Sequence, residues 1–234
     1  MEHFDPTITV IVLLLAAAFV AGYIDTLVGG GGLITIPALM AAGLPPIMAL
    51  GTNKLQAVAG SATATITLLS QSKIKFFDVK WLMVAAFIGS LVGATAVQFI
   101  DTDVLNWVIP SVIMAIGAYF IITAKKKVVE RPPLLTKKAY GLTAVPVVGF
   151  YDGMFGPGTG SFFVWAGVAL KGQAIVRSTM TAKALNFSTN LAALIVFTWF
   201  GKIAWGIGLS MMLGQALGAH LGAKSLMTVN PMLC

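Results

Sequence analysis

Two stretches of this chain, residues 22–61 and 149–190, repeat one pattern of charged residues and glycines inside apolar sequence. Asp25 in the first stretch matches Asp152 in the second at a spacing of 127, and Lys54 matches Lys183 at a spacing of 129. A charged group at bilayer depth costs about 2.5–3.5 kcal/mol on insertion scales, so a charge within apolar sequence is a candidate functional group. The repeat therefore predicts two related halves, with the function carried by residues that recur in both.

The low content of charged residues identifies the broad class of protein. The chain of 234 residues is 58% hydrophobic and 10% charged, whereas soluble domains carry about a quarter charged residues. Uncharged runs of about 20 residues fit helices that cross a hydrocarbon core about 30 Å thick. The sequence therefore predicts an all-α integral membrane protein. The formal net charge of +7 is interpreted as membrane orientation, and no nucleic-acid partner is expected.

Uncharged runs define the expected segments of two membrane repeats. The basic segment 125–138 is expected to be a cytoplasmic linker between a first repeat, 1–124, and a second, 139–234. Prolines break the run 33–50, which predicts a short helix followed by a turn. The second repeat has no counterpart of the span at 104–124, so the chain is expected to be truncated or to end early. The other expected segments are 7–24, 55–72 and 81–100 in the first repeat, and 139–151, 153–170, 184–201 and 203–223 in the second.

The basic residues predict how the segments are oriented. With the linker in the cytoplasm and the N-terminus in the periplasm, 12 of the 15 lysines and arginines face the cytoplasm. Five segments before the linker would invert the second half relative to the first. Inverted repeats with broken helices are typical of secondary transporters. The predicted architecture is therefore a multi-pass helical bundle with an inverted internal repeat and short or broken helices.

Small residues at every fourth position predict close helix packing, because they let helix backbones approach each other in lipid. This spacing occurs once in each half. The glycines concerned are Gly89 and Gly93 in the first half, and Gly214, Gly218 and Gly222 in the second.

Lys54 and Lys183 are the candidate residues for binding an anionic substrate, since they would supply positive charge at the interface between the halves. The alternative is a structural pairing with Asp25 and Asp152, and the two roles are compatible if the aspartates orient the lysines when no solute is bound. The aspartates are in turn candidates for ion coupling or proton relay. Capping of a half-helix is their alternative role.

Polar residues and glycines complete the predicted substrate site. Asn53, Thr181 and Asn186 lie near the lysines in sequence and could hydrogen-bond the oxygens of a solute, with bonding between helices as the alternative. The glycine runs 29–32 and 156–160 precede short apolar helices, whose N-terminal N–H groups and dipole favour an anion. Tight helix packing is the alternative for these glycines. Those assigned to the site are Gly29, Gly30, Gly31, Gly156 and Gly158.

The longest strings of the repeat are GYIDTLVGGGGLITIPALMAAG with GTNKLQA, and GFYDGMFGPGTGSF with TAKALNFSTN. Through these strings, and over essentially its whole length, the chain resembles the TauE/SafE family of sulfite and organosulfur-anion exporters. The resemblance implies a multi-pass permease of the bacterial inner membrane that carries a small anion such as sulfite, a sulfonate or a related organosulfur compound. The missing final span departs from the family's pattern.

The resulting prediction is a secondary transporter, not an enzyme, with a small anionic solute and the lipid bilayer as partners. Homo-oligomers are left open. Neither a cofactor nor a metal is expected, since Cys234 is the single cysteine and no Cys/His metal spacing occurs. Two alternatives remain, a passive anion channel and an intramembrane aspartyl protease. The protease needs two carboxylates that share a proton, which paired lysines would oppose.

Overall fold

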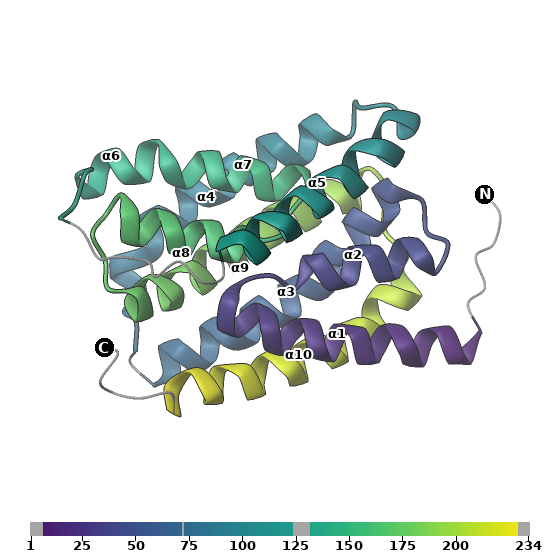
Figure 1. Cartoon of the computed structure of the whole chain (residues 1–234), viewed down its shortest axis with the longest axis horizontal. Coiled ribbons are helices and arrows are strands. Elements are labelled where there is room, and N and C mark those ends of the chain that lie inside the picture. The colour runs from purple at the N-terminus through teal and green to yellow at the C-terminus, as the bar shows by residue number, and fades with distance from the viewer. Residues whose placement is uncertain (1–6, 72, 124–131, 229–234) are drawn as a thin grey trace.

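The computed structural model of the chain describes residues 7–71, 73–123 and 132–228. Within these residues every regular element is an α-helix, which confirms the predicted all-α class. The long helices form one elongated bundle (Figure 1). The first half of the predicted linker 125–138, and the sequence after residue 231 where a further span was expected, lie outside the described residues.

The first half begins with α1 (Ile8–Val28), which ends at a left-handed Gly29 with φ 83°. A short helix, α2 (Gly32–Ala41), and a turn then lead into the long helix α3 (Pro46–Ser70), as the prolines predicted. The predicted start of this span at residue 55 was wrong. Proline is well tolerated at the first position of a helix, so α3 begins at Pro46 and carries Lys54 within its length.

Two further helices, α4 (Phe76–Val97) and α5 (Thr102–Thr123), complete the first half. The second half opens with α6 (Lys137–Leu142) and α7 (Ala144–Met154), so the expected segment 139–151 is interrupted at Thr143. The short helix α8 (Thr159–Ala169) is followed by α9 (Ile175–Trp199) and α10 (Trp205–Thr228). The predicted start at residue 184 was also late, since α9 already contains Lys183.

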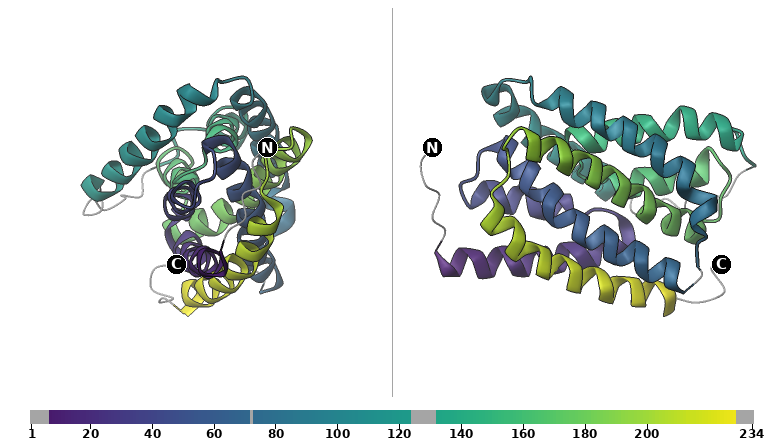
Figure 2. Two further views of the ribbon diagram at one scale, coloured as in Figure 1. Left: turned by 90° about the vertical axis from the view of Figure 1, so that its right-hand side faces the viewer. Right: turned by 180° about the vertical axis from the view of Figure 1, so that it is seen from behind.

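Several of these helices suit a membrane. The helices α1, α4, α5 and α9 are each long and apolar enough to span a bilayer, while α2 and α8 are short and apolar. The outer face of α5 is strongly apolar, with Trp107 and Ile121 each 80% exposed. In the end-on view of Figure 2, α5 projects from the side of the bundle. Such a surface fits contact with lipid, and the chain is a multi-pass membrane protein.

Helices from the two halves pack against each other in matched pairs. The helix α1 lies along α10 at the bottom of Figure 1, and α7 lies along α4 at the top. At the centre α3 contacts α9, while α3 also packs on α10 and α9 on α4. The predicted close packing at glycines is confirmed. A Cβ atom at Gly93 would overlap the Phe150 carbonyl of α7, and one at Gly218 would overlap the Phe19 carbonyl of α1.

Candidate functional site

Two buried lysine–aspartate pairs connect the first half of the chain with the second. Lys54 Nζ lies 3.0 Å from Asp152 Oδ1 and also donates to the backbone carbonyl of Asp152. Lys183 Nζ lies 4.0 Å from Asp25 Oδ2 and donates to the backbone carbonyl of Asp25. Each lysine therefore contacts the aspartate of the other half. Both lysine side chains are 1% exposed, so neither charge reaches bulk water.

The helices explain why each ammonium group reaches these atoms. Lys54 lies eight residues after the first residue of α3, and Lys183 lies eight residues after the first residue of α9. Their partners lie in the last turns of α1 and α7. The last four carbonyls of a helix have no partner within the helix and form the negative end of its dipole. Each lysine thus neutralises both a carboxylate and the C-terminal end of a helix.

The two glycine turns lie against each other beside these pairs. Gly29 packs against Gly160, and Ser161 N–H donates to the Gly29 carbonyl at 3.4 Å. Gly156 has φ 93°, and a Cβ atom there would lie 2.8 Å from Lys54 Nζ. A side chain at Gly156 would therefore displace the ammonium group, whereas a Cβ at Gly30 would make only ordinary contact with the Leu33 side chain.

Asp25 also holds the start of α2. Gly31 N–H donates to Asp25 Oδ1 at 3.1 Å, and Gly31 is the residue that precedes the helix. The carboxylate lies at the positive end of the α2 dipole, where a negative charge is favourable. Asp25 therefore combines two of the roles considered from the sequence, the partner of a lysine and the cap of a short helix.

A small polar cavity of about 20 Å³ lies between the two pairs. This volume holds about one water molecule, since a single water needs at least about 10–15 Å³ of such space. Side chains and backbone from both glycine turns and from α1, α3, α7, α9 and α10 surround the cavity. The lining residues are Asp25, Gly31, Gly32, Asn53, Ala57, Asp152, Gly156, Gly160, Asn186, Asn190 and Gln215.

Hydrogen bonds orient the amide groups of the cavity. Asn53 Oδ1 accepts from Thr35 Oγ1 at 2.6 Å and from Gln56 Nε2 at 2.9 Å. Asn186 Oδ1 accepts from Asn190 Nδ2 at 3.2 Å. The side-chain oxygens of Asn53 and Asn186 therefore already accept hydrogen bonds. Their amide nitrogens are the atoms that could donate to a solute.

Two of the residues that line this cavity carry a buried oxygen without a hydrogen-bond partner. Within the described part of the chain, Asp152 Oδ2 and Gln215 Oε1 have no hydrogen-bond partner although both residues line the space. An unpaired buried acceptor is costly, about 1–3 kcal/mol for a neutral group. These atoms are therefore poised to accept a proton, a water or a polar group of a solute.

The structure brings together six of the predicted site residues at the cavity, and the lysines adjoin it through their aspartates. Thr181 lies elsewhere, since its hydroxyl donates to the Arg177 carbonyl at 2.9 Å and it lines a second pocket. Gly29 and Gly30 belong to the first of the two glycine turns but do not line the small polar cavity. Gly158 immediately precedes α8, has φ 76° and lies against Phe120 of α5.

Gln215 is a cavity residue that the sequence analysis missed. It is an amide in an otherwise apolar stretch of α10, between Gly214 and Gly218. A polar side chain in a predicted span is the signal that could have identified it. The prediction concentrated on residues near the lysines, and α10 carries no lysine close to this point.

Comparison with known proteins assigns the chain to a family. The family described as sulfite exporter TauE/SafE matches residues 14–233. The chain belongs to this family. Within the TauE/SafE family, it is 43% identical to a "Probable membrane transporter protein" of Haemophilus influenzae, over 96% of this chain and 88% of that protein.

Two further relatives cover the chain to a similar extent. The "Probable membrane transporter protein YfcA" of Escherichia coli K12 is 42% identical over 96% of this chain and 85% of its own length. The "Probable membrane transporter protein YunE" of Bacillus subtilis is 22% identical over 91% of this chain and 87% of its own length. No solved structure matches the chain. The resemblance seen in the sequence motifs is confirmed, and the chain is a membrane transporter of the TauE/SafE type.

Proposed function

We propose that this TauE/SafE protein is a secondary transporter of the bacterial inner membrane for a small anion, such as sulfite or a sulfonate. The observation that carries the proposal is the pair of buried lysines, Lys54 and Lys183, beside a cavity lined from both halves. Buried charges at membrane depth are expensive and are typical of solute pathways. The solute class is also the one in the family's description, sulfite.

In the proposed mechanism the anion replaces the aspartates as the partner of the lysines. The amide nitrogens of Asn53 and Asn186 would add hydrogen bonds to its oxygens. The cavity of about 20 Å³ is too small for sulfite together with its hydration, so binding requires the halves to move apart. Because each lysine bridges the halves, releasing its aspartate would loosen the interface that must open.

Proton movement offers a means of coupling. Asp152 lines the cavity, and its Oδ2 has no partner among the described residues, so this oxygen is a candidate to accept a proton. A protonated Asp152 would no longer neutralise Lys54, and the lysine would then be free to bind the anion. Asp25 would act in the same way on Lys183. Anion binding and protonation would thus favour each other.

An inverted repeat would provide the alternation of access. The pairing of α1 with α10 and of α7 with α4 is what an exchange of equivalent helices between two halves would produce. The equal position of the lysines in α3 and α9 supports the same relation. Rocking of one half against the other would then expose the site to each side in turn. The linker 125–138 would lie in the cytoplasm and the N-terminus in the periplasm.

The two alternatives from the sequence are separable by experiment. Each aspartate contacts a lysine, an arrangement that opposes the shared proton of an aspartyl protease. A passive channel would conduct without saturation, whereas an alternating-access transporter saturates and shows exchange of labelled solute across the membrane.

Transport into proteoliposomes tests the proposal. Purified protein is reconstituted, and uptake of labelled sulfite, a short alkyl sulfonate and acetate is measured over a range of concentrations. We expect saturable uptake of sulfite or the sulfonate that is lost in Lys54→Met and Lys183→Met. Lys202→Met is the matched control, because Lys202 is exposed and lies outside the site. Normal uptake by both buried-lysine variants, with normal folding, would refute the proposed site.

A further inference from the structure

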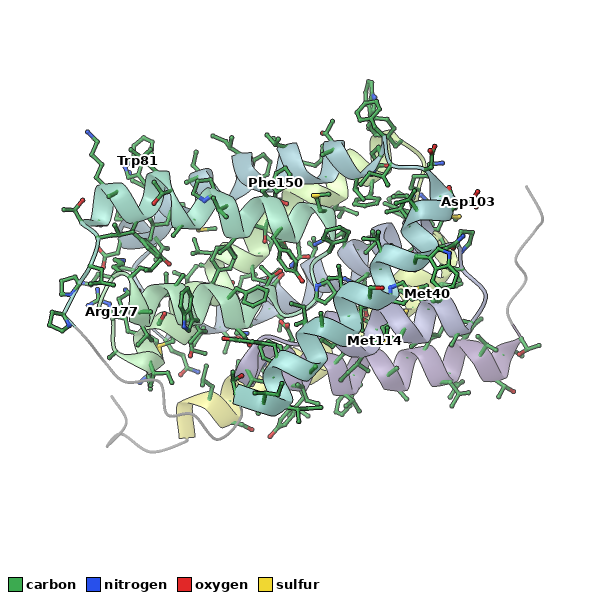
Figure 3. All side chains as sticks on the ribbon, turned by 45° about the horizontal axis from the view of Figure 1, so that its top comes forward. Met40, Trp81, Asp103, Met114, Phe150 and Arg177 are labelled. Carbon is green, nitrogen blue, oxygen red and sulfur yellow. The ribbon has the colours of Figure 1, made fainter. Side chains whose placement is uncertain are left out.

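A second, larger pocket lies at one end of the molecule. Its volume is about 740 Å³, and it is formed where the connection before α4, the start of α6 and the connection between α8 and α9 meet. Figure 3 shows Arg177 at this end and Asp103 at the opposite end. Five basic side chains contribute to its lining, namely Lys73, Lys75, Lys137, Lys171 and Arg177.

The positive charge of this basic pocket is poorly compensated. Asp78 is the one acidic residue among the described residues that line it. Its carboxylate lies 3.8 Å from Arg177 Nη2, and both side chains are more than half exposed, so the pair is weak. Even with this pair counted as neutral, four lysines remain around one space.

Two further features add to the positive potential. Burial and the neighbouring charges of Lys137 and Arg177 lower the pKa of Lys171, which means that these cations repel one another. The first turn of α9 also lines the pocket and contains no acidic residue, so the positive end of its dipole is not neutralised from within the helix. An anion in the pocket would relieve both effects.

The basic pocket lies close to the central cavity along α9. Met180 and Thr181 form part of its wall, while Asn186 of the same helix lines the central cavity. Five residues of an α-helix span about 7.5 Å, which is fewer than two turns. An anion held near Thr181 would therefore have to move less than two helical turns along α9 to reach the level of Asn186.

We propose that the basic pocket is a first binding station for the transported anion, from which the solute passes along α9 to the central cavity. This inference rests on the proposed function and adds to it the side from which the anion approaches. The pocket is too wide to enclose a sulfite-sized ion, and three of its four lysines are exposed. Binding there is weak and depends on the summed charge, so the pocket raises the local concentration of anions rather than selecting among them.

The test compares two double variants that remove the same amount of charge. Lys75→Gln with Lys137→Gln removes two of the positive charges that line the pocket, and Lys138→Gln with Lys202→Gln removes two exposed lysines that do not line it. Initial rates of sulfite and sulfonate transport are measured in proteoliposomes at low and high salt. At low salt we expect the KM of the pocket variant to rise about 3–10-fold with little change in Vmax, an effect within the range of electrostatic focusing. At about 0.5 M salt the difference from wild type should shrink to less than about 2-fold, because salt screens exposed charges.

The outcomes separate the two proposals. A wild-type protein that transports neither anion overturns the proposed function and the binding station with it. A wild type that transports, with equal KM values in the pocket and control variants, overturns the station alone. The measurement is repeated in liposomes with and without phosphatidylglycerol. If the pocket variant differs from the control only when this anionic lipid is present, the pocket binds lipid headgroups and the proposal is wrong.

Discussion

Lys54 and Asp152, 98 residues apart in the chain, form a buried ion pair at 3.0 Å that joins α3 of the first half to the last turn of α7 in the second. The lysine also donates to the backbone carbonyl of Asp152. One ammonium group thus binds one oxygen of the carboxylate and the C-terminal end of a helix. The pair joins the two halves beside the central cavity, which Asp152 lines.

Removing both partners of this pair should destabilise the protein by less than the sum of the two single removals. Lys54→Met leaves Asp152 buried without its cation, and Asp152→Asn leaves Lys54 without its anion. Each single change is expected to cost about 3–5 kcal/mol, whereas the double variant should cost less than the sum of the two. Thermal unfolding in detergent measures the order of stability. Additive losses in the double variant would show that the two side chains do not stabilise each other.

The reciprocal pair should be weaker. Lys183 Nζ is 4.0 Å from Asp25 Oδ2, and the Asp25 side chain is 15% exposed against 2% for Asp152. Coulomb attraction falls with distance and with access of water. A double-mutant cycle with Lys183→Met and Asp25→Asn is therefore expected to give a smaller coupling than the cycle for Lys54 and Asp152. Equal couplings would mean that the difference in geometry has no energetic consequence.

The sequence predicted the turns and the charged residues of the site better than their pairing. Prolines before α3 and the glycines after α1 act locally on the backbone, so their effect is visible in a short stretch. The internal repeat identifies Lys54 as the counterpart of Lys183, but it does not show which aspartate each lysine contacts. That choice depends on how the halves pack in space. The starts of α3 and α9 were placed late because the charged lysines interrupt the apolar runs, although both helices continue through them.

Gln215 and Thr181 also show that distance along the sequence does not determine which residues line a cavity. Gln215 reaches the central cavity because α10 packs against α1 and α3, a contact that sequence distance does not reveal. Thr181 is only two residues from Lys183, yet residues two apart on a helix do not face the same way. It lines the basic pocket instead.

Glycine substitutions should show whether the left-handed backbone conformation at Gly156 is required. Gly156→Ala forces a side chain onto a left-handed residue and onto Lys54 Nζ, so we expect loss of the ion pair, lower thermal stability and loss of transport. Gly30→Ala is the matched control, because its Cβ would have room beside Leu33. Sulfite uptake and the melting temperature are measured for both variants. Equal behaviour would indicate that the backbone at Gly156 adapts and that its conformation is not required.

Removing the positive charge of Lys171 should stabilise the protein in a pH-dependent way. Burial and the nearby Lys137 and Arg177 lower the pKa of Lys171 below its ordinary value of 10.5, so the charged form is less favourable in the folded state than in the unfolded state. Below the folded-state pKa the lysine is charged in both states, and the cost of burying and crowding its charge is present in full. As the pH rises toward 10.5 both states become neutral and the cost disappears.

Lys171→Gln should therefore raise the melting temperature at pH 7, and this gain should fade between the lowered pKa and 10.5. Lys138→Gln, an exposed lysine outside the pocket, should give no such pH-dependent gain. A gain for Lys171→Gln that is absent at pH 7 or grows with pH would contradict the crowding of positive charge in the basic pocket.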